Sequence, residues 1–186
     1  MGKIILASSS PRRRFLLEKA HYEFDVIPSP YKEDHTVTDF SYEFIASLAE
    51  GKAKAVIPLV KEPSLIIGAD TVVVLDNKIL GKPHNKSNAF NMLRSLSGKT
   101  HIVVTGIAVV NSKTGEVKKS ASTSNVTFEN LTDEQINYYI ENFKPLDKAG
   151  SYGIQEMPDG YIKSYTGRLD NIIGLDVEMV AKLLED

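Results

Sequence analysis

Apolar positions along the chain predict an alternation of strands and helices. Apolar runs and alternating patterns are typical of strands, and apolar stripes at a spacing of three or four residues are typical of helices. Strands are expected at residues 4–7, 24–27, 65–75, 78–83, 102–110, 117–128 and 171–175. Helices are expected at residues 11–20, 41–56, 87–96, 132–142 and from 177 onward.

The connections between these elements indicate the fold class. Asp76-Asn77 between two apolar runs predicts a tight hairpin, and a second hairpin is expected around residues 111–115. Residues 144–160 are rich in glycine and proline and predict a long loop, of the kind that often carries function. Because hairpins are mixed with strand–helix alternation, we expect an α/β fold with a mixed, twisted central sheet and flanking helices.

Composition narrows the classes of function. The 186 residues are expected to form a single domain, residues 1–186, because 42% hydrophobic and 25% charged residues are ordinary globular values. A net charge of −2 argues against a nucleic-acid binder held by bulk positive charge. No apolar run is long enough for a signal peptide or a membrane span, so we expect a cytoplasmic protein.

The residue types present also limit metal chemistry. The chain has no cysteine, which excludes disulfides and zinc-thiolate sites. Its four histidines, at 21, 35, 84 and 101, lack ligand spacing. If a metal takes part, carboxylates and substrate phosphates should hold it, which favours Mg²⁺ or Mn²⁺.

The first helix begins with a pattern typical of anion binding. Ser10 is a favourable N-cap, Pro11 occupies the first helical position, and Arg12 and Arg13 follow within one turn. Free N–H groups, the positive end of the helix dipole and the arginine forks all suit phosphate oxygens. The alternative is a capped helix with solvated arginines, the role we expect for Arg14. Three serines, a proline and two arginines together favour a phosphate cradle.

Asp70 is the strongest candidate for chemistry. It lies in the run at 65–75, which is otherwise almost wholly apolar. An ionised carboxylate there is costly unless it is paired, bound to metal or facing a cleft. We expect a metal ligand or the base that activates water. The alternative is a structural aspartate bonded to turn backbone.

Two lysines accompany this carboxylate. Lys52 falls on the apolar stripe of the helix at 41–56, and we expect it to snorkel out to solvent rather than reach into a cleft. Lys82 ends the second arm of the first hairpin. A strict two-residue turn would pair Thr71 with Lys82 and point Asp70 to the other face. Either a bulge corrects this register or Lys82 acts from a neighbouring surface.

Two loops carry further candidates. Glu33 and Asp34 lie in a polar segment and by themselves indicate only solvated acids. The block at 147–155 (DKAGSYGIQ) contains small residues that let a backbone approach a ligand, and Gln155 offers both donors and an acceptor. This combination suits the edge of a nucleobase. A flexible surface turn is the alternative, and Tyr152 and Ile154 argue against it.

Five blocks of the chain, taken in order, resemble the Maf family. They are residues 7–13 (ASSSPRR), 68–73 (GADTVV), 81–83 (GKP), 93–101 (LRSLSGKTH) and 147–155. The resemblance covers nearly the whole chain. It implies an inosine-triphosphatase-like fold with two lobes around a cleft, in a homodimeric cytoplasmic enzyme. The implied activity is that of a metal-dependent nucleoside triphosphate pyrophosphatase, which releases nucleoside monophosphate and pyrophosphate.

The resemblance also implies roles for individual residues. Asp70 matches the family's proton acceptor. Residues at positions linked to substrate choice are Arg12, Thr71 and Gln155. Residues at polar cleft positions expected to hold phosphate or metal are Ser9, Arg13, Glu33, Lys52 and Lys82, with Glu33 and Asp70 as the expected metal ligands.

The block GSYGIQ looks like the subgroup that acts on dTTP and UTP, and the resemblance implies a house-cleaning task, the exclusion of non-standard nucleotides. This chain departs from the family pattern at Glu156-Met157-Pro158, where a glycine-rich turn is usual, and at Asp176, where proline is usual. The alternatives are a 7-methyl-GTP pyrophosphatase and a non-catalytic regulator of septum formation that binds nucleotide or nucleic acid. An aspartate in an apolar strand beside phosphate-binding groups favours the enzyme.

Overall fold

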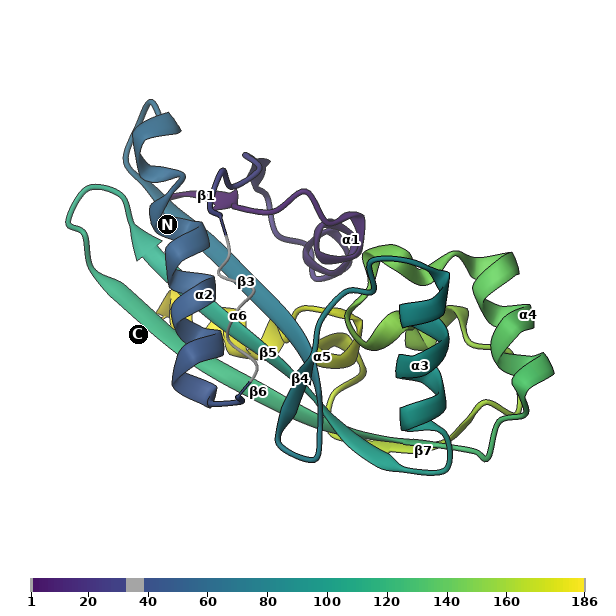
Figure 1. Cartoon of the computed structure of the whole chain (residues 1–186). Helices are drawn as coiled ribbons and strands as arrows, with labels where there is room; N and C mark the ends of the chain where they lie inside the picture. Colours follow the sequence, from purple (N-terminus) through teal and green to yellow (C-terminus); the bar gives the residue numbers. More distant parts are fainter. Residues whose placement is uncertain (1, 33–38, 186) are drawn as a thin grey trace.

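A computed structural model describes residues 2–32 and 39–185 and arranges them around one seven-stranded sheet (Figure 1). The strand order is β2-β1-β3-β5-β6-β7, and β4 pairs with β3 beside this path. β1 runs parallel to β2 and β3, and the other pairs are antiparallel. The mixed sheet expected from the sequence is therefore confirmed. The strands are β1 (Lys3–Leu6), β2 (Asp25–Val26), β3 (Ser64–Leu75), β4 (Lys78–Leu80), β5 (Thr100–Asn111), β6 (Val117–Phe128) and β7 (Ile162–Thr166).

Helices cover both faces of this sheet. They are α1 (Pro11–Lys19), α2 (Tyr42–Lys54), α3 (Lys86–Leu96), α4 (Asp133–Phe143), α5 (Leu169–Ile173) and α6 (Val177–Glu185). Successive strand residues point to opposite faces. Accordingly, Ile66 packs with Ala53 of α2, whereas its neighbour Ile67 packs with Leu17 of α1 and Val180 of α6.

The far ends of the long strands carry a second lobe. There α3 and α4 pack against β5 and β6 through a cluster that includes Leu93, Val103, Phe128 and Ile136. Figure 1 shows α3 and α4 gathered at the end of the molecule opposite α2. The expected two-lobed arrangement is present, and β3, β5 and β6 run through both lobes.

Two glycines let α2 lie unusually close to the sheet. Gly68 of β3 and Gly106 of β5 face this helix. A Cβ at Gly68 would lie 2.1 Å from the carbonyl oxygen of Ala49. A Cβ at Gly106 would lie 2.4 Å from the carbonyl oxygen of Ile45. The glycines therefore allow a short distance between α2 and β3, and this distance determines how far the α2 side chains extend over the strand.

We expect Gly68→Ala to lower the free energy of unfolding by about 1–3 kcal/mol, because the added methyl meets helix backbone rather than a side chain that can rotate away. Urea denaturation measures this change. Gly81→Ala is the matched control, since a Cβ at Gly81 meets nothing within 4 Å. Equal stability of the two variants would contradict the close approach of α2.

The structure corrects two sequence expectations about the sheet. The strand expected at 171–175 is wrong, because α5 occupies Leu169–Ile173 and the last strand is β7. Asn171 Nδ2 donates to the Val103 carbonyl (3.1 Å) and to Ser124 Oγ (2.9 Å), which fastens this segment across the face of the sheet instead of along its edge. Leu75 pairs with Lys78 as the tight turn predicts, but β4 ends at Leu80, so the hairpin register does not extend to Lys82.

The loop expected at 144–160 contains short 3₁₀ turns. They span Pro145–Asp147, Ala149–Ser151 and Ile154–Glu156. Gly150 at the middle turn has a φ of +63°, and a Cβ there would meet the Val73 side chain at 2.8 Å. The loop therefore packs against β3 and is not a solvated surface turn.

Candidate active site

The edge of β3 is open at the position of Asp70. β1 pairs with β3 only as far as Ile67, and β4 pairs with it from Val73 onward. Between these two strands, residues 68–72 form an edge that neither β1 nor β4 covers. A cavity of about 660 Å³ adjoins this edge and is lined from both lobes. An open edge explains how a side chain in the middle of a central strand can face a cleft.

Most of the predicted site residues line this cavity. They are Arg12, Arg13, Lys52, Asp70, Thr71, Lys82 and Gln155. Ser9 is exposed and is not among the lining residues of the described chain, whereas Ser10 is. Glu33 lies outside the described residues. Lys82 lies beyond the end of β4 and reaches the cavity from its exposed rim. Of the two alternatives left by the hairpin register, a bulge or a neighbouring surface, the structure has the second.

Asp70 forms an ion pair with Lys52 on the side of the sheet covered by α2. Lys52 Nζ lies 2.5 Å from Asp70 Oδ1, and the two side chains are only 13% and 9% exposed. The expectation that Lys52 snorkels to solvent is wrong, because the close approach of α2 places its side chain over β3. The ammonium compensates the charge of a carboxylate that would otherwise be costly in an apolar strand.

Arg13 is held on the opposite side of β3. Its Nε donates to the Gly174 carbonyl (2.9 Å), Nη1 to Ser8 Oγ (3.3 Å) and Nη2 to Thr71 Oγ1 (3.1 Å). Ser10 is the N-cap of α1 and accepts from the Arg13 backbone N–H, so the expected helix start is confirmed. Asp70 therefore presents its carboxylate on one face of β3, and Thr71 holds the Arg13 guanidinium on the other face.

Arg14, by contrast, points away from the cleft. It is exposed and donates to Glu18 Oε1 one helical turn later (2.7 Å). The prediction of a solvated arginine at this position is confirmed. Only the first two arginines of the triplet belong to the cavity.

A line of alternating charges crosses the other end of the cleft. Arg12 Nη1 donates to Asp147 Oδ2 (3.0 Å), and Lys148 Nζ lies 2.8 Å from Asp147 Oδ1 and 3.1 Å from Glu156 Oε2. Burial raises the pKa of Asp147, but its bonds to Lys148 and Arg12 outweigh burial and hold that pKa below its usual value. Sequence reasoning missed Lys148, a buried lysine whose only local signal is the run of small residues after it.

Aromatic side chains support the loop that carries Gln155. Tyr152 is buried, and its hydroxyl oxygen lies 2.6 Å from His101 Nε2. The Gly153 N–H donates to the Tyr139 hydroxyl oxygen (3.1 Å). Burial lowers the pKa of His101 to about 4, so this histidine is neutral at pH 7. Tyr152 and His101 therefore brace the loop, and sequence reasoning gave His101 no role because its partner lies 51 residues away.

The cavity combines charged and apolar walls. Its lining includes the Asp70 carboxylate and the cationic side chains of Lys52, Arg12 and Arg13, while Val103 and Ile172 contribute apolar surface. Within residues 2–32 and 39–185, no group of three or more histidine or acidic side chains is placed to hold a metal ion by itself. Among the helices of the same described ranges, none is long and apolar enough to cross a membrane.

Comparison with known proteins identifies the family. A model of the family described as "Maf-like protein" matches residues 3–186. The dTTP/UTP pyrophosphatase of Clostridium novyi (strain NT) is 41% identical over 187 residues, covering 99% of this chain and 97% of that protein. The dTTP/UTP pyrophosphatase of Bdellovibrio bacteriovorus (strain ATCC 15356 / DSM 50701 / NCIMB 9529 / HD100) is 38% identical, covering 97% and 96%.

One solved structure that aligns with the chain is more distant in sequence than these relatives. A HAM1 protein from Coxiella burnetii aligns with a TM-score of 0.49 at 15% identity, covering 100% of this chain and 99% of that chain. The family model and the curated relatives span nearly the full length, and the cleft assembles residues from four of the five blocks that carry the resemblance, all but residues 93–101. The chain therefore belongs to the Maf family.

Proposed function

We propose that this chain, acting as one domain, hydrolyses nucleoside triphosphates to nucleoside monophosphate and pyrophosphate, with dTTP and UTP preferred. The observation that carries this proposal is the position of Asp70, an ion-paired carboxylate on an open strand edge inside a cleft with arginine and lysine side chains. The names of the curated relatives agree with the same reaction. The enzyme acts as a homodimer in the cytoplasm.

The cations of the cleft bind the triphosphate. Arg13 is oriented by three hydrogen bonds from its guanidinium, so little rotamer freedom is lost when it binds a phosphate oxygen. Lys82 and Arg12 approach from the rim and offset charge on the leaving pyrophosphate. Positive groups from both lobes thereby surround the phosphate chain.

Asp70 activates the attacking water. Its carboxylate accepts a proton from water while the water oxygen bonds to the α-phosphorus, and the bond from that phosphorus to the bridging oxygen breaks. The electron pair of the broken bond leaves with pyrophosphate. Lys52, at 2.5 Å, keeps the carboxylate in place for this transfer.

The donor set of the cleft fits a hard divalent cation such as Mg²⁺ or Mn²⁺. Mg²⁺ is commonly held by one or two carboxylates together with substrate phosphates and water. Asp70 supplies one such oxygen donor, and Glu33, which lies outside the described residues, is the second expected ligand. When bound, the cation would neutralise charge on the triphosphate and fix its orientation.

The loop at 147–156 recognises the base. Gln155 lines the cavity, and its side-chain amide complements the carbonyl and imide N–H edge of uracil or thymine. Thr71 and Arg12 contact the same cavity from the phosphate side. A neutral amide at this position does not suit the fixed positive charge of 7-methylguanine.

The release of pyrophosphate from a panel of nucleotides tests the proposed function. We expect the wild-type enzyme to release pyrophosphate from dTTP and UTP at the highest kcat/KM. Faster turnover of 7-methyl-GTP would overturn the base preference but keep the reaction. Binding without any release of pyrophosphate would favour the non-catalytic regulator.

Gln155→Glu is expected to lower kcat/KM for dTTP and UTP about 5- to 150-fold, because a carboxylate cannot donate to the carbonyl oxygens of the base. Steady-state kinetics on both substrates measures this loss. The matched control is Glu156→Gln, which interconverts the same two side chains one residue later. A similar loss in both variants would indicate a disturbed loop, not a lost contact with the base.

A further inference from the structure

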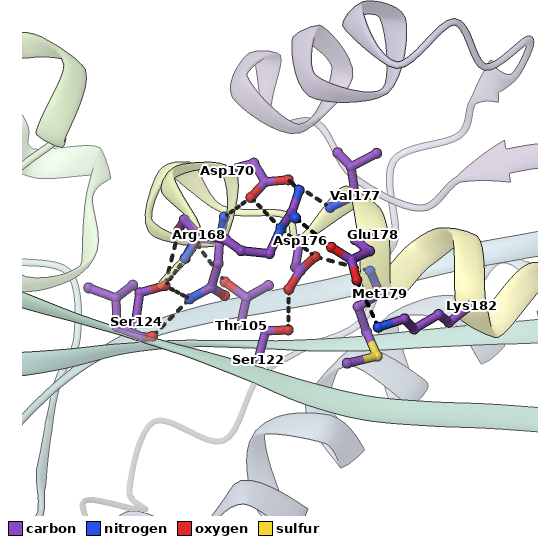
Figure 2. Close-up of polar contacts among 12 residues, drawn as sticks. Thr105, Ser122, Ser124, Arg168, Asp170, Asp176, Val177, Glu178, Met179 and Lys182 are labelled. Atoms are coloured by element: carbon purple, nitrogen blue, oxygen red, sulfur yellow. Dashed lines mark hydrogen bonds and ion pairs between the residues drawn. The ribbon is translucent and has the colours of Figure 1, made fainter. Parts of the chain in front are cut away.

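A cluster of charged side chains holds the turn between α5 and α6 (Figure 2). Arg168, just before α5, contacts three carboxylates with its guanidinium. It donates to Asp170 from Nε (3.0 Å) and Nη2 (2.8 Å), and to Glu178 from Nη1 (2.6 Å). Its Nε also lies 3.1 Å from Asp176 Oδ1. One arginine thus joins the beginning of α5 to the beginning of α6.

Two of these carboxylates fix the backbone on either side of Gly174. Asp170 Oδ1 accepts from the Asn171 N–H before the glycine (3.0 Å), and Asp170 Oδ2 accepts from the Val177 N–H after it (3.1 Å). Asp176 is 5% exposed, and Ser122 Oγ of β6 donates to its Oδ2 (2.5 Å). The turn is therefore tied both to itself and to the sheet.

The carbonyl at the centre of this turn points to the cleft. The Gly174 carbonyl accepts from Arg13 Nε (2.9 Å) and from Thr71 Oγ1 (3.2 Å). Gly174 has a φ of +136°, a conformation that other residues rarely adopt. The Nε–H bond lies in the plane of the guanidinium. The carbonyl oxygen that accepts from Nε therefore helps to set the orientation of that plane, and with it the directions of the Nη1 and Nη2 donors.

We propose that Asp170 and Asp176 are positioning residues, which hold the α5–α6 turn so that the Gly174 carbonyl orients Arg13 toward the phosphates. The proposal rests on the proposed function for what Arg13 binds, whereas the orientation of Arg13 is a property of the free protein. Glu178 differs from the two aspartates. It contacts Arg168 from an exposed position beyond the turn and is expected to orient nothing in the cleft.

Three variants with the same chemical change separate positioning from general charge loss. Asp170→Asn, Asp176→Asn and Glu178→Gln each turn one carboxylate partner of Arg168 into an amide. We expect the first two to raise KM for dTTP about tenfold with kcat within about twofold, because a misoriented Arg13 weakens ground-state and transition-state binding alike. Glu178→Gln is expected to leave both constants within about twofold of wild type.

A double-mutant cycle shows whether the effect passes through Arg13. In an Arg13→Gln background, Asp170→Asn is expected to change KM by less than about twofold, since the group it positions has been removed. A tenfold rise that persists in this background would overturn the proposal. Circular dichroism checks folding. If an aspartate variant fails to fold, Ser122→Ala replaces it and removes only the Ser122 hydrogen bond to Asp176.

A second measurement needs no activity. The Arg13 Nε–H signal in an NMR spectrum, assigned by its loss in Arg13→Lys, reports the bond to the Gly174 carbonyl. We expect this signal to shift or broaden in both aspartate variants and to stay unchanged in Glu178→Gln. An unchanged signal in the aspartate variants would refute the positioning role. If wild-type enzyme releases no pyrophosphate, the proposed function fails, and the NMR signal alone decides the positioning.

Discussion

Asp70→Asn is expected to lower kcat for dTTP about 10²- to 10⁴-fold while leaving the protein folded. An amide has nearly the same shape as the carboxylate and can still accept a hydrogen bond from Lys52, so the change removes the base with little loss of packing. It cannot take the proton of the attacking water. Pyrophosphate release at saturating dTTP measures the loss, and circular dichroism with urea denaturation measures folding.

Asp147→Asn is the matched control for this variant. Asp147 also lines the cavity, and its side chain is 60% exposed and paired with Arg12. We expect the control to keep kcat within about tenfold of wild type. Nearly full activity in Asp70→Asn would refute the assignment of the base. An unfolded Asp70→Asn protein would instead favour a structural ion pair.

The position of Asp70 in a cleft beside a compensating charge could be predicted because its signal is local. A carboxylate in an apolar run carries a free-energy cost wherever the run folds, so a compensating group or a cleft was expected. The structure supplies both: Lys52 pairs with the carboxylate, and the edge of β3 is open between β1 and β4. The start of α1 was predictable for the same reason, since Ser10 and Pro11 act within one turn.

Features that depend on distant parts of the chain could not be predicted. The apolar stripe of α2 by itself pointed Lys52 to solvent, and only the family resemblance implied a place in the cleft; the pattern does not show that glycines of β3 and β5 bring the helix close enough for the ammonium to reach Asp70. The segment at 171–175 has the composition of a strand, yet the bonds of Asn171 to Val103 and Ser124 hold it as a helix across the sheet. Hydrogen-bond partners 47 and 68 residues away leave no pattern in the local sequence.

The same limit applies to the roles of backbone groups. The Gly174 carbonyl orients Arg13 across 161 residues, and the glycine itself shows only that a turn is present. Residues that bind through side chains can be predicted from their type, because arginine and aspartate carry recognisable chemistry. A carbonyl is common to every residue, so its role is visible only when the fold places it.

Removal of divalent metal is expected to reduce pyrophosphate release to the background rate, and Mg²⁺ or Mn²⁺ should restore it. The protein contributes few oxygen donors, because within the described residues no group of three or more acidic or histidine side chains is placed to hold a metal ion. Affinity should therefore depend on the triphosphate, which supplies the remaining hard oxygen ligands. Enzyme treated with a chelator and then dialysed is assayed with dTTP at increasing Mg²⁺ concentration.

Because the cation is expected to be held mainly by the nucleotide, the stability of the protein without nucleotide serves as the control for the metal experiment. Chelation alone is expected to leave the urea denaturation midpoint unchanged, since a cation held mainly by substrate adds nothing to the stability of the free protein. A lower midpoint after chelation would indicate a resident structural metal instead. Full activity after exhaustive chelation would refute metal dependence and leave Arg12 and Lys82 to offset the charge of the pyrophosphate without a cation.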